Sequence, residues 1–147
     1  MALIDFSIIL SLSYFFCSKI HFLVNFIPAK EHPLYLWFFY YVTAYLLKRR
    51  FNRVHIEVEY HPSKNTSTLF YLNHNYWWDA LMPNYLNRRF FGQKARGMMD
   101  IRELKKYPYF TKIGAFSVDV EQPKSSIYSL KYALNHLQTA NASIYIF

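Results

Sequence analysis

A histidine and an aspartate five residues apart are the side chains of this sequence best suited to acid–base chemistry. His74 and Asp79 lie within residues 73–79 (NHNYWWD). An aspartate bonded to one imidazole nitrogen fixes the tautomer and stabilises the imidazolium, which leaves the other nitrogen free to take a proton. Such a pair can deprotonate a substrate hydroxyl, which then attacks a thioester carbonyl. Chance is the alternative, because the chain holds six histidines.

The segments around this pair indicate how it would be positioned. Residues 68–72 (TLFYL) form a continuous apolar run, as expected of a strand buried on both faces of a parallel sheet. Residues 79–87 predict a short helix. Partners on one helix face are three or four residues apart, so we expect His74 on the turn that leaves the strand. Asp79 then lies in the first helical turn, where the helix dipole favours its ionised form. Ligands bind at such strand ends in open α/β sheets.

The rest of the chain after residue 50 alternates between strand-like and helix-like segments. Residues 54–60 (VHIEVEY) alternate apolar and polar, which predicts a strand with one wet face. Further elements are predicted as strands at 93–99, 116–120 and 143–147 and as a short basic helix over 102–106 that Pro108 closes. This rhythm predicts an α/β fold with a mixed, mostly parallel sheet flanked by helices.

The clearest helix follows Pro123, which suits a first helical turn, and precedes Asn141, a suitable C-terminal cap. Its apolar residues fall at steps of three, four and three and form one stripe. They are Ile127, Leu130, Leu134 and Leu137. The strand-like run after it ends the sequence at Phe147, so we expect the domain over 51–147 to be incomplete.

Residues 1–50 predict helices that associate with a membrane. Residues 6–18 match a signal-peptide core in length, but the usual positive residues before it and a cleavage site are missing, so we expect this segment to be retained. Residues 33–47 carry no charge and end in Lys48-Arg49-Arg50. As a helix they would reach about 22 Å, short of the ~30 Å hydrocarbon core. A helix in the headgroup boundary is favoured over a span, and an ordinary core helix is the alternative.

Composition narrows the classes of partner and cofactor. The net charge of +8 and the pI near 9.5 imply anionic partners, and the high aromatic content (21%) favours a membrane surface over nucleic acid. Cys17 is the single cysteine, so no intramolecular disulfide forms, and we interpret it as a small buried hydrophobe. The spacing of His55 and His61 does not suit a metal site, so we expect no metal.

Three ordered blocks over residues 50–147 resemble the glycerolipid acyltransferases, the family that includes the lysophosphatidate acyltransferases. The family's first block is a strand, Asn-His, four residues and Asp. Its second is a basic-Glu-Leu segment, a Pro-aromatic pair and a Gly before a strand ending in Val-Asp-Arg, and its third is an apolar strand running into Phe-Pro-Glu-Gly. The matching residues are 73–79, then Arg102-Glu103-Leu104, Pro108-Tyr109-Phe110 and 114–119 (GAFSVD), then 144–147 (IYIF).

The resemblance implies transfer of a fatty acyl group from acyl-CoA or acyl carrier protein to a lipid hydroxyl, with no cofactor and no metal. It implies His74 as general base, Asp79 as its orienter, and a location on the cytoplasmic face of a membrane. Substrate contacts are expected from the second block, at Arg102, Lys105, Gly114 and Phe116.

The chain departs from the family at two points. It ends before the Pro-Glu-Gly block, and Val120 stands where the family has the Arg after Val-Asp, which in the family is implicated in holding the acceptor's phosphate. Arg102, Lys105, Lys106 or Arg96 can compensate, or the acceptor is a neutral lipid alcohol. The main alternative is a catalytically inactive, membrane-surface lipid-binding protein with the same fold. A nucleic-acid binder is a weaker one.

Overall fold

The computed structural model describes residues 25–73 and 80–147, which form an α/β fold around one parallel sheet. The sheet has the strand order β1-β4-β2-β3, and each neighbouring pair is parallel. The strands are β1 (Thr68–Tyr71), β2 (Lys94–Asp100), β3 (Ala115–Val118) and β4 (Ala142–Ile146). Their carboxyl ends therefore lie at one edge of the sheet, where β1 leads into residues 72–73 and β4 into Phe147.

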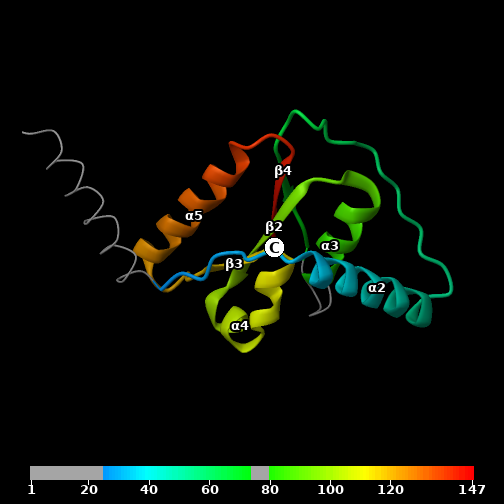
Figure 1. The fold of residues 1–147 in the computed structure, drawn as a ribbon, viewed down its shortest axis with the longest axis horizontal. Coiled ribbons are helices and arrows are strands. Elements are labelled where there is room, and N and C mark those ends of the chain that lie inside the picture. Colours follow the sequence, from blue (N-terminus) through cyan, green and yellow to red (C-terminus); the bar gives the residue numbers. More distant parts are fainter. Residues whose placement is uncertain (1–24, 74–79) are drawn as a thin grey trace, which may run out of the picture.

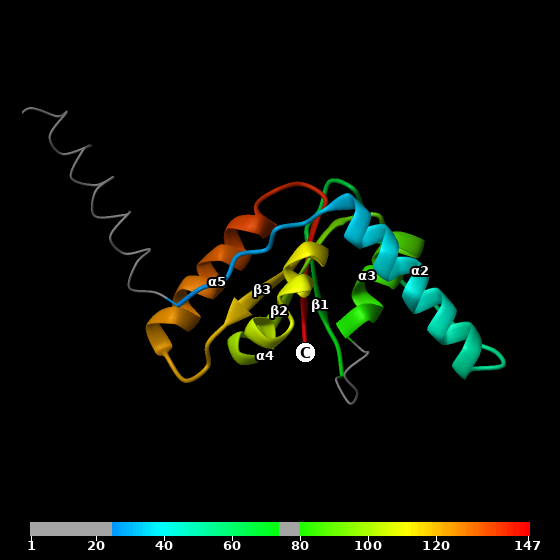
Figure 2. The ribbon, with the colours of Figure 1, turned by 60° about the horizontal axis from the view of Figure 1, so that its bottom comes forward.

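Helices lie on both sides of this sheet (Figures 1 and 2). The helices are α2 (Pro33–Arg50), α3 (Met82–Leu86), the π-helix η2 (Asn87–Phe91), α4 (Ile101–Lys106), the 3-10 helix η3 (Pro108–Ile113) and α5 (Pro123–Leu137). One core cluster joins Phe116 and Ile144 of the sheet to Ala133 of α5. A second cluster joins Leu81, Leu104 and Phe110 on the opposite face.

Side chains alternate in direction along each strand, so neighbouring residues pack in different core clusters. Met98 packs with the α5 cluster, and Met99 packs with the cluster of Leu104 and Phe110. Successive side chains of a strand point to opposite faces, so one strand supplies both cores. Gly97 pairs with Tyr145 in the register between β2 and β4, which places them on the same face as Met99.

Residues 25–32 form an extended segment that runs along β3 and η3. The Ser117 amide donates to the Ile27 carbonyl oxygen (2.9 Å), and the Lys30 amide donates to the carbonyl oxygen of Thr111 (2.9 Å). The Ile27 amide also donates to Ser117 Oγ (2.7 Å). These bonds satisfy backbone groups at the outer edge of β3 and fix the position from which α2 begins.

Most predicted elements are confirmed with small shifts in their bounds. The run at 33–47 is helical within α2, the segment 93–99 corresponds to β2, 102–106 to α4, 116–120 to β3 and 143–147 to β4. The helix predicted over 79–87 begins later as α3 and continues as η2 to Phe91. Pro108 follows the end of α4, as predicted, and begins η3. The sheet is parallel throughout its four described strands.

Two strand predictions are corrected. Residues 54–60 have no regular secondary structure and belong to the long connection between α2 and β1 (Figure 1). An alternating pattern makes a strand only where a partner strand accepts it, and these residues pair with none in the described parts of the chain. β1 is not buried on both faces, because Leu69 is 59% and Tyr71 75% exposed. It lies at the end of the order of the described strands, next to β4.

The helix predicted after Pro123 is confirmed as α5, but most of its apolar stripe does not face the core, where such a stripe normally lies. Ile127, Leu130 and Leu134 are exposed, while the buried positions are Ser125, Ser129, Ala133 and His136. Ser129 Oγ donates to the Ser117 carbonyl oxygen (2.8 Å), so small side chains let the helix approach β3 closely. Gln138 is the C-cap of α5, and Asn141 instead adopts a left-handed conformation (φ 60°) before β4.

α2 is apolar on all sides, which explains its unusual surface. Thr43 and Leu47 are buried against the rest of the protein. Another face is open to solvent and carries large side chains at steps of four, three and four. They are Leu34, Phe38, Tyr41 and Tyr45, each between 60% and 72% exposed. None of the helices in the described residues is long and apolar enough to cross a membrane.

Candidate functional site

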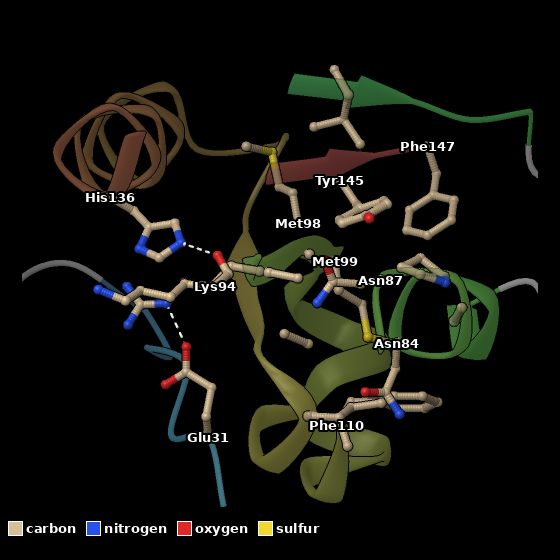
Figure 3. A pocket seen from close by; sticks show the side chains of 18 of the residues that line it. Glu31, Asn84, Asn87, Lys94, Met98, Met99, Phe110, His136, Tyr145 and Phe147 are labelled. Atoms are coloured by element: carbon tan, nitrogen blue, oxygen red, sulfur yellow. Dashed lines mark hydrogen bonds and ion pairs between the residues drawn. The ribbon is translucent and has the colours of Figure 1, made fainter. Parts of the chain in front are cut away.

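A cavity of about 1080 Å³ lies against β2 and β4 and is bordered by α3, η2 and η3 (Figure 3). Its apolar lining comes from strand and helix residues. These include Met99, Phe110, Ala115 and Tyr145. Ala80 and Pro83, which follow His74 and Asp79 in sequence, line it as well. A space of this size and character suits a small or lipidic ligand.

Gly97 gives the cavity room above the sheet. It pairs with Tyr145 in the register of β2 and β4, and both residues line the cavity. A Cβ built on Gly97 meets no atom within 4 Å, and the residue does not adopt a positive φ. The open space above Gly97 is therefore part of the cavity, and a larger side chain at this position would occupy it.

Polar groups between η2 and β2 hold the cavity wall in place. Asn87 Nδ2 donates to the Gln93 carbonyl oxygen (2.8 Å), and the Gln93 amide donates to Asn87 Oδ1 (3.1 Å). Gln93 Nε2 donates to Thr68 Oγ1 (3.2 Å), which ties the wall to β1. Gln93 Oε1 is buried and has no partner among the described residues, so it offers an acceptor to a ligand donor.

An ion pair and a buried histidine lie where the cavity meets the amino end of β2. Arg96 Nε donates to Glu31 Oε1 (2.6 Å), and the guanidinium lies 5.1 Å from the ring centre of Tyr132. Burial raises the pKa of Glu31, but the hydrogen bond from Arg96, a backbone hydrogen bond and the nearby positive charge of Arg96 together outweigh it, and the net shift is downward. His136 Nε2 is 2.8 Å from the Lys94 carbonyl oxygen, and burial lowers the pKa of His136. The histidine is therefore favoured in its neutral form.

At the carboxyl end of the sheet, the Arg102 side chain already bonds to carboxylates of the protein. Asp100 caps α4 by accepting from the Arg102 amide (2.8 Å), and the hydrogen bond from the Arg102 side chain lowers the pKa of Asp100. The guanidinium also donates to Glu121 Oε1 (3.0 Å). Asp100 and the exposed Val120 line the cavity, but Arg102 does not. Arg102 thus links the end of β2, at Asp100, to Glu121 after the end of β3.

The sequence-predicted site residues lie in different surroundings. His74 and Asp79 are outside the described residues. Lys105 is exposed on α4, and Phe116 is fully buried in the α5 cluster. Gly114 adopts a φ of 100°, and a Cβ there would lie 2.7 Å from the Ala95 carbonyl oxygen. None of Arg102, Lys105, Gly114 and Phe116 lines the cavity, so their substrate contacts stay predictions.

Sequence reasoning missed the residues that shape the cavity. Gly97 carried a weak signal as one of only three glycines, since an isolated glycine in a strand suggests a close backbone approach or an opening. Asn87, Gln93 and Tyr145 carried none, because their meeting depends on the order of strands in the sheet. In the described part of the chain, no three His, Cys, Asp or Glu side chains gather as metal ligands would.

Compared with known proteins, the sequence matches no protein-family model, and neither a curated protein nor a solved structure matches it.

Proposed function

We propose that this protein is an O-acyltransferase that moves a fatty acyl group from acyl-CoA or acyl carrier protein to a hydroxyl of a lysophospholipid or related lipid. The observation that carries the proposal is the apolar cavity of about 1080 Å³ lined by Ala80, the residue that follows Asp79. An acyl chain needs an apolar space beside the reacting groups. The motif of His74 and Asp79 supplies the groups for the reaction, and the cavity supplies the space.

In the proposed reaction, His74 takes the proton from the acceptor hydroxyl while Asp79 orients the imidazole. The alkoxide attacks the carbonyl carbon of the thioester, and the C–S bond breaks when the tetrahedral intermediate collapses. The imidazolium returns its proton to the departing thiolate. The products are a lipid ester and a free thiol, so the reaction balances without a cofactor, a metal or a bound nucleophile from the protein.

The surface of α2 supports a membrane location for this reaction. Its open face carries Leu34, Phe38, Tyr41 and Tyr45, and its last turn carries only basic residues. The Arg88 guanidinium lies 3.5 Å from the ring centre of Trp37, at the side of that face. Aromatic rings and basic side chains together suit the boundary between acyl chains and anionic headgroups. A lipid acceptor would be supplied from that boundary, on the cytoplasmic face.

The proposal is tested with radiolabelled acyl-CoA and acyl carrier protein of several chain lengths, offered with lysophospholipids and neutral lipid alcohols. We expect label in one class of acceptor and loss of at least about 10²-fold in rate for His74→Ala, since a general base contributes that much. Gly97→Leu fills the cavity and is expected to slow transfer of long chains more than short ones. Gly97→Ala is the matched control, because it leaves most of the space open.

The outcomes separate the proposal from its main alternative. If no donor labels any acceptor while the protein still binds lysolipid and Gly97→Leu weakens that binding, the protein is an inactive lipid-binding protein with this fold. If His74→Ala retains full activity, the assignment of the general base is wrong. If Gly97→Leu slows the transfer of long and short acyl chains equally, the cavity does not hold the acyl chain during the reaction.

A further inference from the structure

A patch of polar side chains lies on the cavity face of the sheet, near the amino end of the strands. Thr68 of β1 and Ala95 of β2 flank Ser143 of β4 in the register. Gln93 reaches this level, because its Nε2 donates to Thr68 Oγ1 (3.2 Å). Tyr145 lies two residues after Ser143 and shares its face of β4. The polar patch therefore consists of Thr68, Gln93, Ser143 and Tyr145.

Three atoms of the polar patch are buried and have no hydrogen-bond partner among the described residues. They are Gln93 Oε1, Ser143 Oγ and the Tyr145 hydroxyl oxygen. Their residues are 6%, 0% and 1% exposed. A buried polar group without a partner costs free energy, and most such groups in proteins have one. Gln93 and Tyr145 line the cavity, and the Tyr145 side chain lies on the cavity side of β4 (Figure 3), so a ligand there can contact both.

The chemistry of these atoms favours a hydroxyl as the group that they bind. Gln93 Oε1 only accepts a hydrogen bond, whereas a tyrosine hydroxyl donates and accepts. Burial raises the pKa of Tyr145 and outweighs the lowering by the nearby Ser143 hydroxyl, so Tyr145 keeps its proton and can donate. A ligand hydroxyl can donate to Gln93 Oε1 and accept from Tyr145. A ketone or a carboxylate has no proton to donate to Gln93 Oε1.

The surroundings of the polar patch suit an alkyl chain. The Tyr145 ring stacks on Phe70 (4.6 Å between ring centres), and Phe70 stacks on Phe91 (5.1 Å). Met99 and Phe110 line the same cavity. A few polar groups within an apolar space usually fix the position of a ligand that carries matching groups. The matching ligand here is an apolar chain with one hydroxyl.

We propose that the cavity binds a fatty acyl chain with a hydroxyl in its interior, and that this hydroxyl bonds to Gln93 Oε1 and to the Tyr145 hydroxyl. The inference rests on the proposed function, because it takes the bound chain to be the acyl group of the donor. The bound hydroxyl is not the one that is acylated. Thr68 begins β1 and Tyr71 ends it, so the polar patch lies about 10 Å from the strand end that leads to residues 73–79.

Binding of free fatty acids to the full chain tests the inference without acyl transfer. The first probe is a long-chain fatty acid with a hydroxyl in the middle of the chain. The comparison probes are the same acid without the hydroxyl, the same acid with the hydroxyl next to the carboxyl group, and a monoacylglycerol with a plain chain. Isothermal titration calorimetry measures the affinities. We expect the mid-chain hydroxyl to tighten binding about tenfold over the plain acid, since it bonds to two buried groups.

Tyr145→Phe removes the hydroxyl and keeps the ring that stacks on Phe70. This variant should reduce the preference for the mid-chain hydroxy acid from about tenfold to about twofold. Its urea midpoint should not fall, because the Tyr145 hydroxyl has no partner to lose among the described residues. Tyr71→Phe is the matched control, because Tyr71 is 75% exposed and does not line the cavity. It should keep the full preference.

Equal affinities for the acids with and without the mid-chain hydroxyl overturn the inference. So does a lower urea midpoint of Tyr145→Phe with an unchanged preference, since the hydroxyl would then serve the fold alone. If Tyr145→Phe weakens binding of the monoacylglycerol instead, the patch holds the acceptor hydroxyl and the inference is also wrong. The transfer assay tests the proposed function separately. Transfer without a hydroxyl preference overturns only this inference, and a hydroxyl preference without transfer supports the binding site and overturns only the enzyme.

Discussion

At the scale of single residues, alanine substitutions at two glycines are expected to differ in their effect on the free energy of unfolding. Gly114 has a φ of 100°, and its added Cβ would lie 2.7 Å from a backbone oxygen, whereas Gly97 has open space and no positive φ. We expect Gly114→Ala to lower the free energy of unfolding by about 2–4 kcal/mol. Gly97→Ala should stay within about 1 kcal/mol of the parent. Urea denaturation measures both, and equal losses would show that neither backbone conformation nor close packing distinguishes the two sites.

The ion pair of Glu31 and Arg96 predicts that the free energy of unfolding depends on pH in the acidic range. Although burial raises the pKa of Glu31, the hydrogen bond and charge of Arg96, together with a backbone hydrogen bond, leave it lowered relative to the unfolded chain. The stabilisation is therefore present above the unfolded pKa and is lost as the pH falls through the folded pKa. Because both side chains are partly exposed, we expect Glu31→Gln to cost only about 0.5–1 kcal/mol at about pH 6.

This cost should shrink as the pH falls through the folded pKa of Glu31, because the parent carboxylate then becomes protonated as well. Urea midpoints of the parent and of Glu31→Gln, measured across this range, check the convergence. Glu57→Gln is a matched control, because Glu57 lies in the connection between α2 and β1. A Glu31→Gln cost that stays constant with pH would mean that the neutral side chain, and not its charge, packs at this position.

At the scale of elements, the local sequence pattern predicts well which segments are helices and strands. It predicts poorly which of their side chains are buried. α2, α4, α5 and the strands β2 to β4 follow from their apolar runs, prolines and caps. Residues 54–60 have the right alternation for a strand, but no neighbouring strand is available in the described fold. The stripe of α5 identifies a helix, but which face packs on β3 depends on Ser125 and Ser129, whose size allows a close approach. Periodicity alone cannot show this.

In the candidate site, too, features formed by adjacent residues can be predicted from the sequence, and features formed by distant residues cannot. The motif at residues 73–79 is readable because its residues are adjacent in sequence, although the described fold does not include His74 and Asp79. The cavity was not readable, because Gly97 and Tyr145 are far apart in sequence and meet only through the parallel pairing of β2 with β4. That pairing places β4 between β1 and β2, an order that no local signal specifies.

The open face of α2 makes a prediction at this scale. Phe38 and Tyr41 each have most of their side chain in solvent, so Phe38→Ser with Tyr41→Ser should barely change the free energy of unfolding. If this face lies in the membrane boundary, the double variant loses about 2–4 kcal/mol of partitioning into vesicles. Vesicle co-sedimentation measures the loss. Tyr60→Ser, an exposed tyrosine outside the helix, should have little effect. An equal effect of both changes would argue against a specific role of α2.

For the whole molecule, the question is whether net charge or the position of charge governs membrane binding. Lys48, Arg49 and Arg50 end α2, beside its aromatic face. Replacing them with Gln lowers the net charge from +8 to +5, because three positive charges are removed from eight. The same change at Lys64, Lys105 and Lys106 gives the same net charge, and all three are exposed elsewhere in the fold. The two variants therefore have equal long-range attraction and different local contacts.

If the end of α2 rests on the headgroups, each basic residue there contributes about 1 kcal/mol near an anionic surface. The first variant should then bind phosphatidylglycerol vesicles about 10²-fold more weakly at low salt, and the second should lose far less. The difference should shrink as salt approaches about 0.15 M, where charges more than ~8 Å apart are screened. Equal losses would mean that the net charge attracts the protein without orientation. The cavity would then have no fixed relation to the membrane surface from which, in the proposed reaction, the lipid acceptor comes.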